Sequence, residues 1–226
     1  MVKRLFDVAL TALALVACVP ILIVAALGIR LSSPGPVLYR ATRAGRRGRL
    51  FVMYKLRTME TRQQAPLTDS VITAANDPRI FPFGALLRRS KLDELPQLFN
   101  ILRGDMAVVG PRPEDPKVVA QHYTPEQWET LDVPPGLTSP GALYSTTHGE
   151  TALSEREAER DYYEHLLPLK LALDRVYVRH ASVAYDFGVI VRTLTVVLSR
   201  VVGRRHFPDP PEMDEARRLL IPAVAQ

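Results

Sequence analysis

Two adjacent carboxylates, Asp93 and Glu94, stand directly after a basic segment at residues 88–91. Pro96 fits best in the first turn of a helix, so we expect a helix to begin close to Asp93. The free N–H groups and positive dipole of a helix start bind phosphate, and carboxylates bind divalent metal ions. The pattern therefore suits phosphate chemistry with a metal, although a plain helix cap is the commoner cause of this spacing.

A second block, Gly110-Pro-Arg-Pro113, presents one cation in a stiff segment. Arg112 stands between two prolines, which restrict the backbone on both sides. Its forked guanidinium can therefore be aimed at phosphate or carboxylate oxygens. Lys55 and Arg88, taken alone, are more typical of ordinary surface charges.

The composition is that of a single domain with an anionic partner. The chain has 226 residues, a net charge of +5 and one cysteine, Cys18, which excludes an internal disulfide and indicates a reducing compartment. The charge suits a phosphorylated substrate, an acidic lipid or a nucleic acid. The basic stretch 40–62 lacks interleaved aromatic platforms and follows an apolar segment. We therefore expect membrane lipids, and no nucleic acid, as partners.

The apolar segment at residues 8–29 carries no charge and is long enough to cross a bilayer. Pro20 falls near its middle and removes a helical hydrogen bond. Basic residues flank it on both sides, whereas a spanning helix usually shows an asymmetry of lysine and arginine. A re-entrant helix that bends at Pro20 would place both flanks on one side of the membrane. A spanning helix with a proline kink is the alternative.

The remaining segments predict a mixed but mostly helical chain. Two strands at 37–40 and 50–55 would form a hairpin around a turn at 45–48. A helix at 186–202 has a long apolar face and a basic edge, which suits the membrane surface or a core helix equally. We expect short helices at 84–89, 95–102, 125–131, 154–167, 169–180 and 212–220, with a break at Pro168. We expect irregular connections at 62–77, 111–116 and 134–145.

Several blocks, taken in order, resemble one family. They are Lys3-Arg-Leu-Phe-Asp7, Lys55-Leu-Arg57-Thr-Met59, Leu92-Asp-Glu-Leu-Pro-Gln97, and Gly104-Asp-Met106 running on to Gly110-Pro-Arg-Pro113. The chain resembles the bacterial sugar transferases, which are monotopic phosphoglycosyl transferases that begin glycan assembly on a polyprenyl-phosphate carrier. The resemblance continues to about Arg200, so it covers nearly the whole chain.

The resemblance implies an enzyme that moves a sugar 1-phosphate from a UDP-sugar to undecaprenyl phosphate and releases UMP. It implies that Asp93 attacks the sugar-proximal phosphorus to form an aspartyl-phosphosugar, and that Glu94 holds Mg²⁺, with Mn²⁺ as a substitute. Asp186 is either a site residue or a helix-start acid. The residues implied for binding phosphate and nucleotide are Lys55, Arg57, Arg88, Arg112 and Asp174.

The implied fold is α+β and mostly helical, with a small β-hairpin and amphipathic interfacial helices around the active site. Residues 1–31 would form the re-entrant anchor with its break at Pro20, residues 32–205 the catalytic domain and residues 206–226 a C-terminal tail. The site would face the cytoplasm at a bacterial inner membrane. A homo-oligomer is a further alternative, because the sequence does not fix the oligomeric state.

The chain departs from the family pattern at three places. Val19 stands where a serine often precedes the proline, Phe81-Pro82 replaces a polar pair, and the segment 136–142 resembles only one subgroup. The sequence therefore leaves the sugar, the pathway and the carrier length open. A catalytically silent relative and a membrane-tethered nucleic-acid-binding module are the rival interpretations, and the intact Asp93, Glu94 and Arg112 disfavour both.

Overall fold

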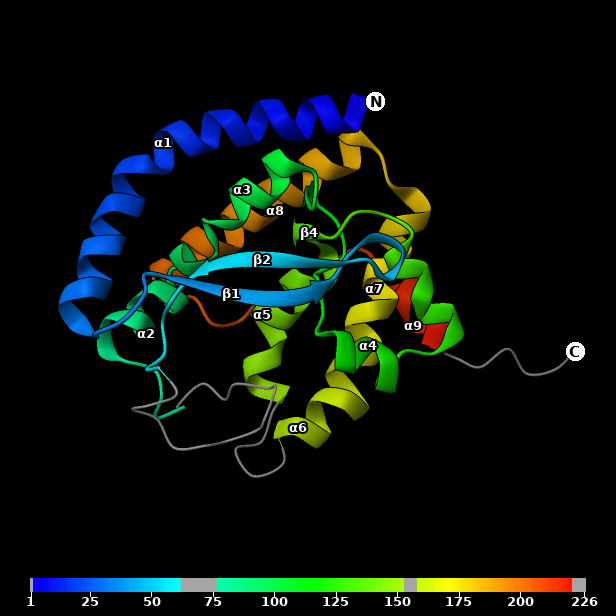
Figure 1. Cartoon of the computed structure of the whole chain (residues 1–226). Helices are drawn as coiled ribbons and strands as arrows, with labels where there is room; N and C mark the ends of the chain where they lie inside the picture. The colour runs from blue at the N-terminus through cyan, green and yellow to red at the C-terminus, as the bar shows by residue number, and fades with distance from the viewer. Residues whose placement is uncertain (1, 62–76, 153–157, 221–226) are drawn as a thin grey trace, which may run out of the picture.

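The computed structural model describes residues 2–61, 77–152 and 158–220 of the chain (Figure 1). Most of the predicted connection at 62–77, and the first residues of the helix predicted at 154–167, lie outside these described residues. The described part is mostly helical with two small sheets, as the sequence indicated.

The chain begins with one long helix, α1 (Val2–Ser32), which contains Pro20. It is the one described helix that is long and apolar enough to cross a membrane. Figure 1 shows that α1 bends partway along its length and arches around one side of the molecule. A proline removes one helical hydrogen bond, and this is a common cause of a bend. Val19, which precedes the proline, is 45% exposed.

The predicted hairpin is confirmed. Strands β1 (Leu38–Ala44) and β2 (Leu50–Leu56) pair antiparallel, so that Tyr39 lies opposite Lys55. The short helix η1 (Arg46–Gly48) forms the tip, where Arg47 has a φ of 55° and Gly48 a φ of 73°. These left-handed residues reverse the chain, and they place the tip at the opposite end of β2 from Lys55.

The central elements carry the two motif blocks. The helical segments are α2 (Pro82–Arg89), η2 (Leu92–Glu94), α3 (Gln97–Arg103), α4 (Pro116–His122) and η3 (Pro125–Leu131). The helix predicted to begin near Asp93 is thus a 3₁₀ turn that leads into α3. Strands β3 (Ala107–Val109) and β4 (Gly136–Thr138) pair in parallel immediately before Gly110 and Ser139.

The C-terminal half is a group of packed helices. They are α5 (Pro140–Ala152), α6 (Ala158–Asp161), the π-helical turn η4 (Tyr162–Leu166), α7 (Leu167–His180), α8 (Val183–Val201) and α9 (Met213–Leu220). The break predicted near Pro168 is not a gap between helices: α6, η4 and α7 follow one another without interruption, and a π-helical turn precedes the proline. The predicted helices at 186–202 and 212–220 are confirmed.

Two predicted connections were wrong in part. Residues 134–145 include β4 and the start of α5, and Pro116 begins α4 instead of closing a loop. Proline, glycine and serine suggested a loop at 134–145, but here they start a helix. The Ser139 hydroxyl accepts from the N–H of Ala142, and Pro140 is suited to a first turn because it lacks an N–H.

Both halves of α1 pack on the same globular body. Leu10, Ala14 and Leu15 contact the largest cluster of buried side chains, which includes Ile101 and Val109. Ala25 and Ile29, near the other end of the helix, pack with Leu56, Phe81 and Leu87. The ends of α1 are therefore held by one and the same domain.

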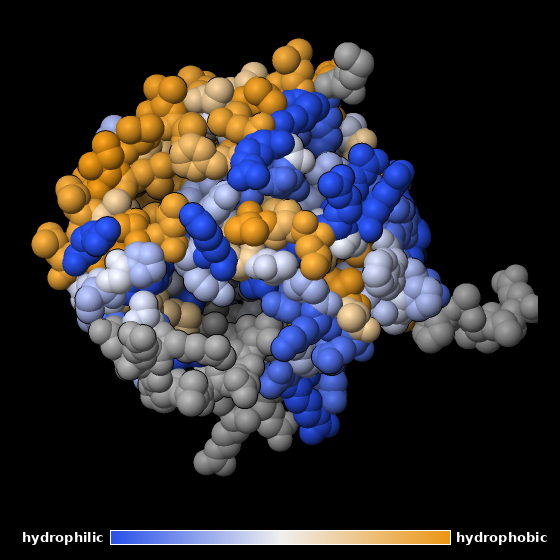
Figure 2. All heavy atoms as spheres, in the orientation of Figure 1, coloured by the Kyte–Doolittle hydropathy of each residue, from blue (hydrophilic) through white to orange (hydrophobic). Residues whose placement is uncertain are grey.

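The outer side of α1 remains apolar and exposed, and Figure 2 shows hydrophobic spheres gathered where this helix lies in Figure 1. A second apolar stripe runs along α8 at the spacing of one helical face. Its exposed members are Phe187, Val191, Leu194, Leu198 and Val201. Exposed apolar area of this extent marks a membrane or partner surface, and the helix composition favours membrane association.

Candidate active site

The two carboxylates lie in η2, at a strained point of the backbone. Lys91, the residue just before η2, has a φ of 58°, a left-handed conformation that a lysine rarely adopts. Such strain often accompanies functional sites, because the surrounding structure must hold it in place. Asp93 and Glu94 are 7% and 9% exposed, so both carboxylates are nearly removed from water.

Glu94 is the centre of a compact ion cluster. The Arg112 guanidinium donates to both of its oxygens, at 2.7 Å to Oε1 and 3.3 Å to Oε2. The Lys55 ammonium lies 3.3 Å from Oε1. Three predicted site residues from the hairpin, η2 and the Gly110–Pro113 loop therefore meet at one carboxylate, although they are far apart in the sequence.

The two neighbouring acids have opposite electrostatic environments. Burial opposes ionisation of Glu94, but the charges of Arg112 and Lys55 outweigh it and hold the pKa of Glu94 well below its usual range. Burial, together with the charge of Glu94, raises the pKa of Asp93. The Oδ1 atom of Asp93 is buried without a hydrogen-bond partner among the described residues. The two acids therefore differ in their surroundings: Glu94 is held ionised by its cations, whereas Asp93 is buried with one oxygen unpartnered.

Arg88 reaches the same region from α2. Its Nε donates to the Thr58 hydroxyl at 2.9 Å, and its positive charge opposes the rise in the pKa of Asp93. The contact depends on Gly84, because a Cβ there would lie 2.2 Å from the carbonyl oxygen of Thr58. The glycine lets α2 pack directly against the chain that follows β2.

Arg57 lies apart from this cluster. Its guanidinium donates to the carbonyls of Pro36 and Ser33, at 2.6 and 2.7 Å, and to the Ser33 hydroxyl at 2.7 Å. The side chain thus holds the turn that connects α1 to the hairpin. In this arrangement its donors are directed at protein oxygens, and its predicted part in phosphate binding stays a prediction.

Asp174 is also separate from the pair of carboxylates. It is fully buried in α7, where Oδ1 accepts from the N–H of Gly141 at 2.9 Å and Oδ2 has no described partner. Burial raises the pKa of Asp174 to about 6. Nearby, Lys170 forms an ion pair with Glu114. Asp186 lies in the first turn of α8 and pairs with Lys3.

Glu114 and Lys170 were not predicted from the sequence as residues of this region. Glu114 follows the Pro113 end of the arginine loop, and its charge adds to that of Glu94 in raising the pKa of Arg112. Lys170 and the Tyr162 hydroxyl, at 3.1 Å from Oε1, hold Glu114 in turn. The only sequence signal was the position of Glu114 next to the proline, because its partners lie far along the chain.

No group of three or more histidine, cysteine, aspartate or glutamate side chains suited to a metal ion occurs within residues 2–61, 77–152 and 158–220. The pair Asp93–Glu94 nevertheless fits a magnesium ion, which usually takes one or two carboxylates and completes its coordination with waters and substrate phosphates. The unpartnered Oδ1 of Asp93 is an acceptor of the required kind beside the ionised Glu94.

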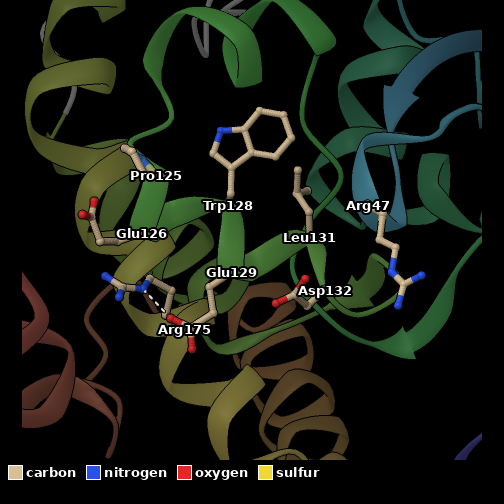
Figure 3. A pocket seen from close by; sticks show the side chains of 8 residues that line it. All are labelled: Arg47, Pro125, Glu126, Trp128, Glu129, Leu131, Asp132 and Arg175. Atoms are coloured by element: carbon tan, nitrogen blue, oxygen red, sulfur yellow. Dashed lines mark hydrogen bonds and ion pairs between the residues drawn. The ribbon is translucent and has the colours of Figure 1, made fainter.

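An open hollow of about 640 Å³ lies elsewhere, near the hairpin tip (Figure 3). Arg47, Trp128 and Asp132 line it, and Glu129 bonds Arg175 at its edge. Leu50 at the start of β2 is about 17 Å from Lys55 by the rise of a strand. This hollow is therefore not part of the cluster around Glu94.

Comparison with known proteins bears directly on this cluster. Residues 1–200 match the bacterial sugar transferase family, and the matched region includes Asp93, Glu94, Lys55 and Arg112. The chain belongs to the bacterial sugar transferase family. This confirms the resemblance, and several of the relatives that match the chain are named as sugar-phosphate transferases.

Three relatives illustrate the range of the family. A UDP-glucose:undecaprenyl-phosphate glucose-1-phosphate transferase of Caulobacter vibrioides is 36% identical, over 87% of this chain and 70% of its own length. One of the same name from Xanthomonas campestris pv. campestris is 39% identical, over 88% of this chain but 39% of its own length. An exopolysaccharide production protein of Rhizobium leguminosarum bv. phaseoli is 35% identical, over 89% of this chain and 97% of its own length. The chain thus spans less than half of the Xanthomonas relative and nearly all of the Rhizobium relative.

Proposed function

We propose that this chain transfers a sugar 1-phosphate from a UDP-sugar to undecaprenyl phosphate through a covalent intermediate on Asp93. The observation that carries the proposal is the contrast between the two acids. Glu94 is fixed and ionised by Arg112 and Lys55, while Asp93 beside it has a buried, unpartnered oxygen. A carboxylate held without a protein partner is available to attack phosphorus. The names of the relatives make UDP-glucose the first donor to test.

The proposed transfer consists of two successive displacements at phosphorus. A carboxylate oxygen of Asp93 forms a bond to the sugar-proximal phosphorus, the bond from that phosphorus to the bridging oxygen breaks, and UMP leaves with the electron pair. A phosphate oxygen of undecaprenyl phosphate then attacks the same phosphorus and breaks the acyl-phosphate bond. This step restores Asp93 as a carboxylate and yields the undecaprenyl diphosphate sugar.

The cations around the pair carry out the electrostatic part of the reaction. A diphosphate repels an incoming carboxylate, so positive charge must stand beside it before the attack. Arg112, Lys55 and Arg88 supply this charge within one cluster. A magnesium ion held by Glu94 would neutralise further phosphate charge. The Arg112 guanidinium makes two contacts with Glu94, so one of its N–H groups could turn to a phosphate oxygen while the other stays on the carboxylate.

The apolar surface would place this site at the lipid boundary, on the cytoplasmic side. With 31 residues, α1 is about 46 Å long, which exceeds the roughly 30 Å of hydrocarbon in a bilayer. Its Lys3 end contacts α8 and its Ile29 end contacts Phe81 and Leu87, so both ends lie on one body. These anchors favour a helix that enters and leaves the same face. The apolar stripe of α8 would rest on that face.

Two measurements test the proposal with purified protein in detergent or nanodiscs. UMP release from UDP-glucose, with undecaprenyl phosphate as acceptor, should occur and should stop when the acceptor is exhausted. Brief incubation with radiolabelled UDP-sugar and no acceptor should leave label on the protein, and peptide mapping should place it at Asp93. Release of UDP instead of UMP, or stable label on another residue, would contradict the proposed reaction.

A further inference from the structure

The first turn of α1 holds the strand that leads into the Arg112 loop. The Lys3 Nζ atom lies 3.1 Å from the carbonyl oxygen of Val109 and 2.5 Å from Oδ2 of Asp186. One turn further along α1, Oδ1 of Asp7 accepts from the N–H of Val108 at 3.2 Å. The amino-terminal end of the apolar helix is therefore attached to β3 by the side chains of Lys3 and Asp7.

Asp186 and Tyr177 complete this junction. The Tyr177 hydroxyl oxygen lies 2.6 Å from Oδ1 of Asp186 and 3.1 Å from the Val109 carbonyl oxygen. A hydroxyl has one proton, and the closer carboxylate is the stronger acceptor. The Val109 carbonyl is thus left to the Lys3 ammonium. Because the Asp186 side chain has no exposed area, loss of Lys3 would leave a buried charge without its cation.

The chain between Val109 and Arg112 is rigid. The N–H of Gly110 donates to the Thr138 carbonyl at 3.0 Å, and the Pro111 carbonyl accepts from the N–H of Gly136 at 2.9 Å. A Cβ at Gly110 would lie 2.4 Å from the Pro134 carbonyl oxygen, so the two backbones are in direct contact. The two prolines beside Arg112 restrict the loop further. A shift of Val109 is therefore passed on to the guanidinium.

We propose that Lys3, with Asp186 and Tyr177, is a positioning residue that fixes the Arg112 guanidinium against Glu94. The junction then connects the position of α1 in the lipid to the position of Arg112 relative to Glu94. The proposal rests on the proposed function in one respect, which is that Arg112 takes part in the transfer. Lys3 itself touches neither Glu94 nor the site of attack, so its effect is exerted through Val109.

A double-mutant cycle between Lys3→Met and Arg112→Lys tests this coupling. We expect Lys3→Met to lower kcat by about tenfold, to change KM for the UDP-sugar by less than about threefold, and to be largely rescued by Lys3→Arg. In the Arg112→Lys background the bidentate contact with the Glu94 carboxylate is already lost. There the Lys3→Met change should cost less than about twofold, because residues that act through one another are not additive.

Arg4→Met is the matched control. Arg4 belongs to the same turn of α1 and carries the same charge, but its guanidinium donates to the carbonyls of Ile101 and Leu102. Any effect of Arg4→Met should therefore multiply with that of Arg112→Lys. The positioning proposal is wrong if the loss of activity in Lys3→Met also multiplies with the loss in Arg112→Lys. It is also wrong if Lys3→Met acts only through weaker membrane association or a lower Tm.

Tyr177→Phe provides a second variant should Lys3→Met fail to fold, because it keeps the ring and removes only the hydroxyl. It should show the same non-additivity with Arg112→Lys. The failures of the two proposals are distinguishable. Wild-type activity in both Arg112→Lys and Arg112→Ala would remove Arg112 from the reaction and overturn both. Impaired Arg112 variants without coupling to position 3 or 177 would overturn the positioning role alone.

Discussion

Arg112 donates to both oxygens of Glu94, at 2.7 and 3.3 Å, while Oδ1 of the neighbouring Asp93 has no partner among the described residues. Two acids that are adjacent in the chain therefore have opposite electrostatic environments. The pKa of Glu94 is lowered by the nearby cations, and the pKa of Asp93 is raised by burial and by Glu94. Such a separation assigns distinct roles to the two members of a carboxylate pair.

Asp93→Asn should abolish transfer without destabilising the fold. Asparagine keeps the shape of the side chain but is a poor nucleophile, so UMP release should fall by at least about 1000-fold. The substitution also removes a buried negative charge beside Glu94, so the free energy of unfolding should be unchanged or higher. Activity and thermal unfolding measure the two effects. Glu164→Gln, at an acid with 52% of its side chain exposed, is the control. Activity of Asp93→Asn within tenfold of the wild type would exclude a covalent role.

Glu94→Gln should have the opposite effect on stability. It leaves Arg112 and Lys55 without their carboxylate, so the free energy of unfolding should fall by about 1–3 kcal/mol. Denaturant unfolding of Glu94→Gln and Asp93→Asn, measured side by side, checks this contrast. Equal effects of the two substitutions on stability would contradict the assignment of different environments.

Transfer should require a divalent metal ion. Exhaustive treatment with EDTA should abolish UMP release, and Mg²⁺ or Mn²⁺ should restore it, because charge on the diphosphate must be neutralised before a carboxylate approaches. Glu94→Gln should raise the metal concentration needed for half-maximal activity, whereas Glu60→Gln, whose carboxylate accepts from the Ser33 hydroxyl, should not. Full activity in the presence of EDTA would refute the requirement.

Asp174→Asn should change the dependence of stability on pH. The folded-state pKa of about 6 lies above the usual 3.8, so the contribution of Asp174 to stability is present below about pH 3.8 and is lost as the pH rises through about 6. At pH 7.5 the variant should therefore be more stable than the wild type, by up to about 3 kcal/mol. The advantage should shrink toward pH 4 in denaturant titrations.

The same variant also decides whether Asp174 takes part in catalysis. Asparagine retains an acceptor for the Gly141 N–H, so the packing of α5 on α7 should persist. Transfer activity at pH 7.5 near the wild-type level would make Asp174 a structural residue. A large loss of kcat in a stable variant would instead place its charge in the reaction.

Pro20→Leu should shift α1 toward a spanning topology, because it restores the helical hydrogen bond that the proline removes. Single cysteines from Val2→Cys and Arg49→Cys, in a Cys18→Ser background, report the two sides of the helix. In the presence of Pro20 both should react only with a reagent applied from the cytoplasmic side. Reaction of the cysteine at position 2 from the periplasmic side would show that α1 spans the membrane.

Local signals predicted much of this fold, and long-range contacts account for the rest. The glycine-containing turn between two apolar runs predicted the hairpin, and Pro96 predicted a helix start within a few residues of its position. The Ser139–Pro140–Gly141 sequence suggested a loop. It starts α5 because Ser139 caps it locally and because Asp174, far along the chain, receives the Gly141 N–H.

The site shows the same division between local and distant information. The adjacency of Asp93 and Glu94 and the prolines beside Arg112 are visible in the sequence, and the structure brings Arg112 and Lys55 to Glu94. Residue types alone did not indicate which acid Arg112 would neutralise. They also did not show that the Arg57 guanidinium is directed at the Ser33–Pro36 turn.

The attachment of both ends of α1 to one body has a consequence for the bilayer itself. A helix that enters and leaves on one side, as we propose, adds its volume to a single leaflet and leaves the area of the other unchanged. The lipids of that leaflet must spread to accommodate it, which favours bending of the bilayer toward the protein. The enzyme would then sense curvature and lateral pressure, so its recruitment should vary with vesicle diameter.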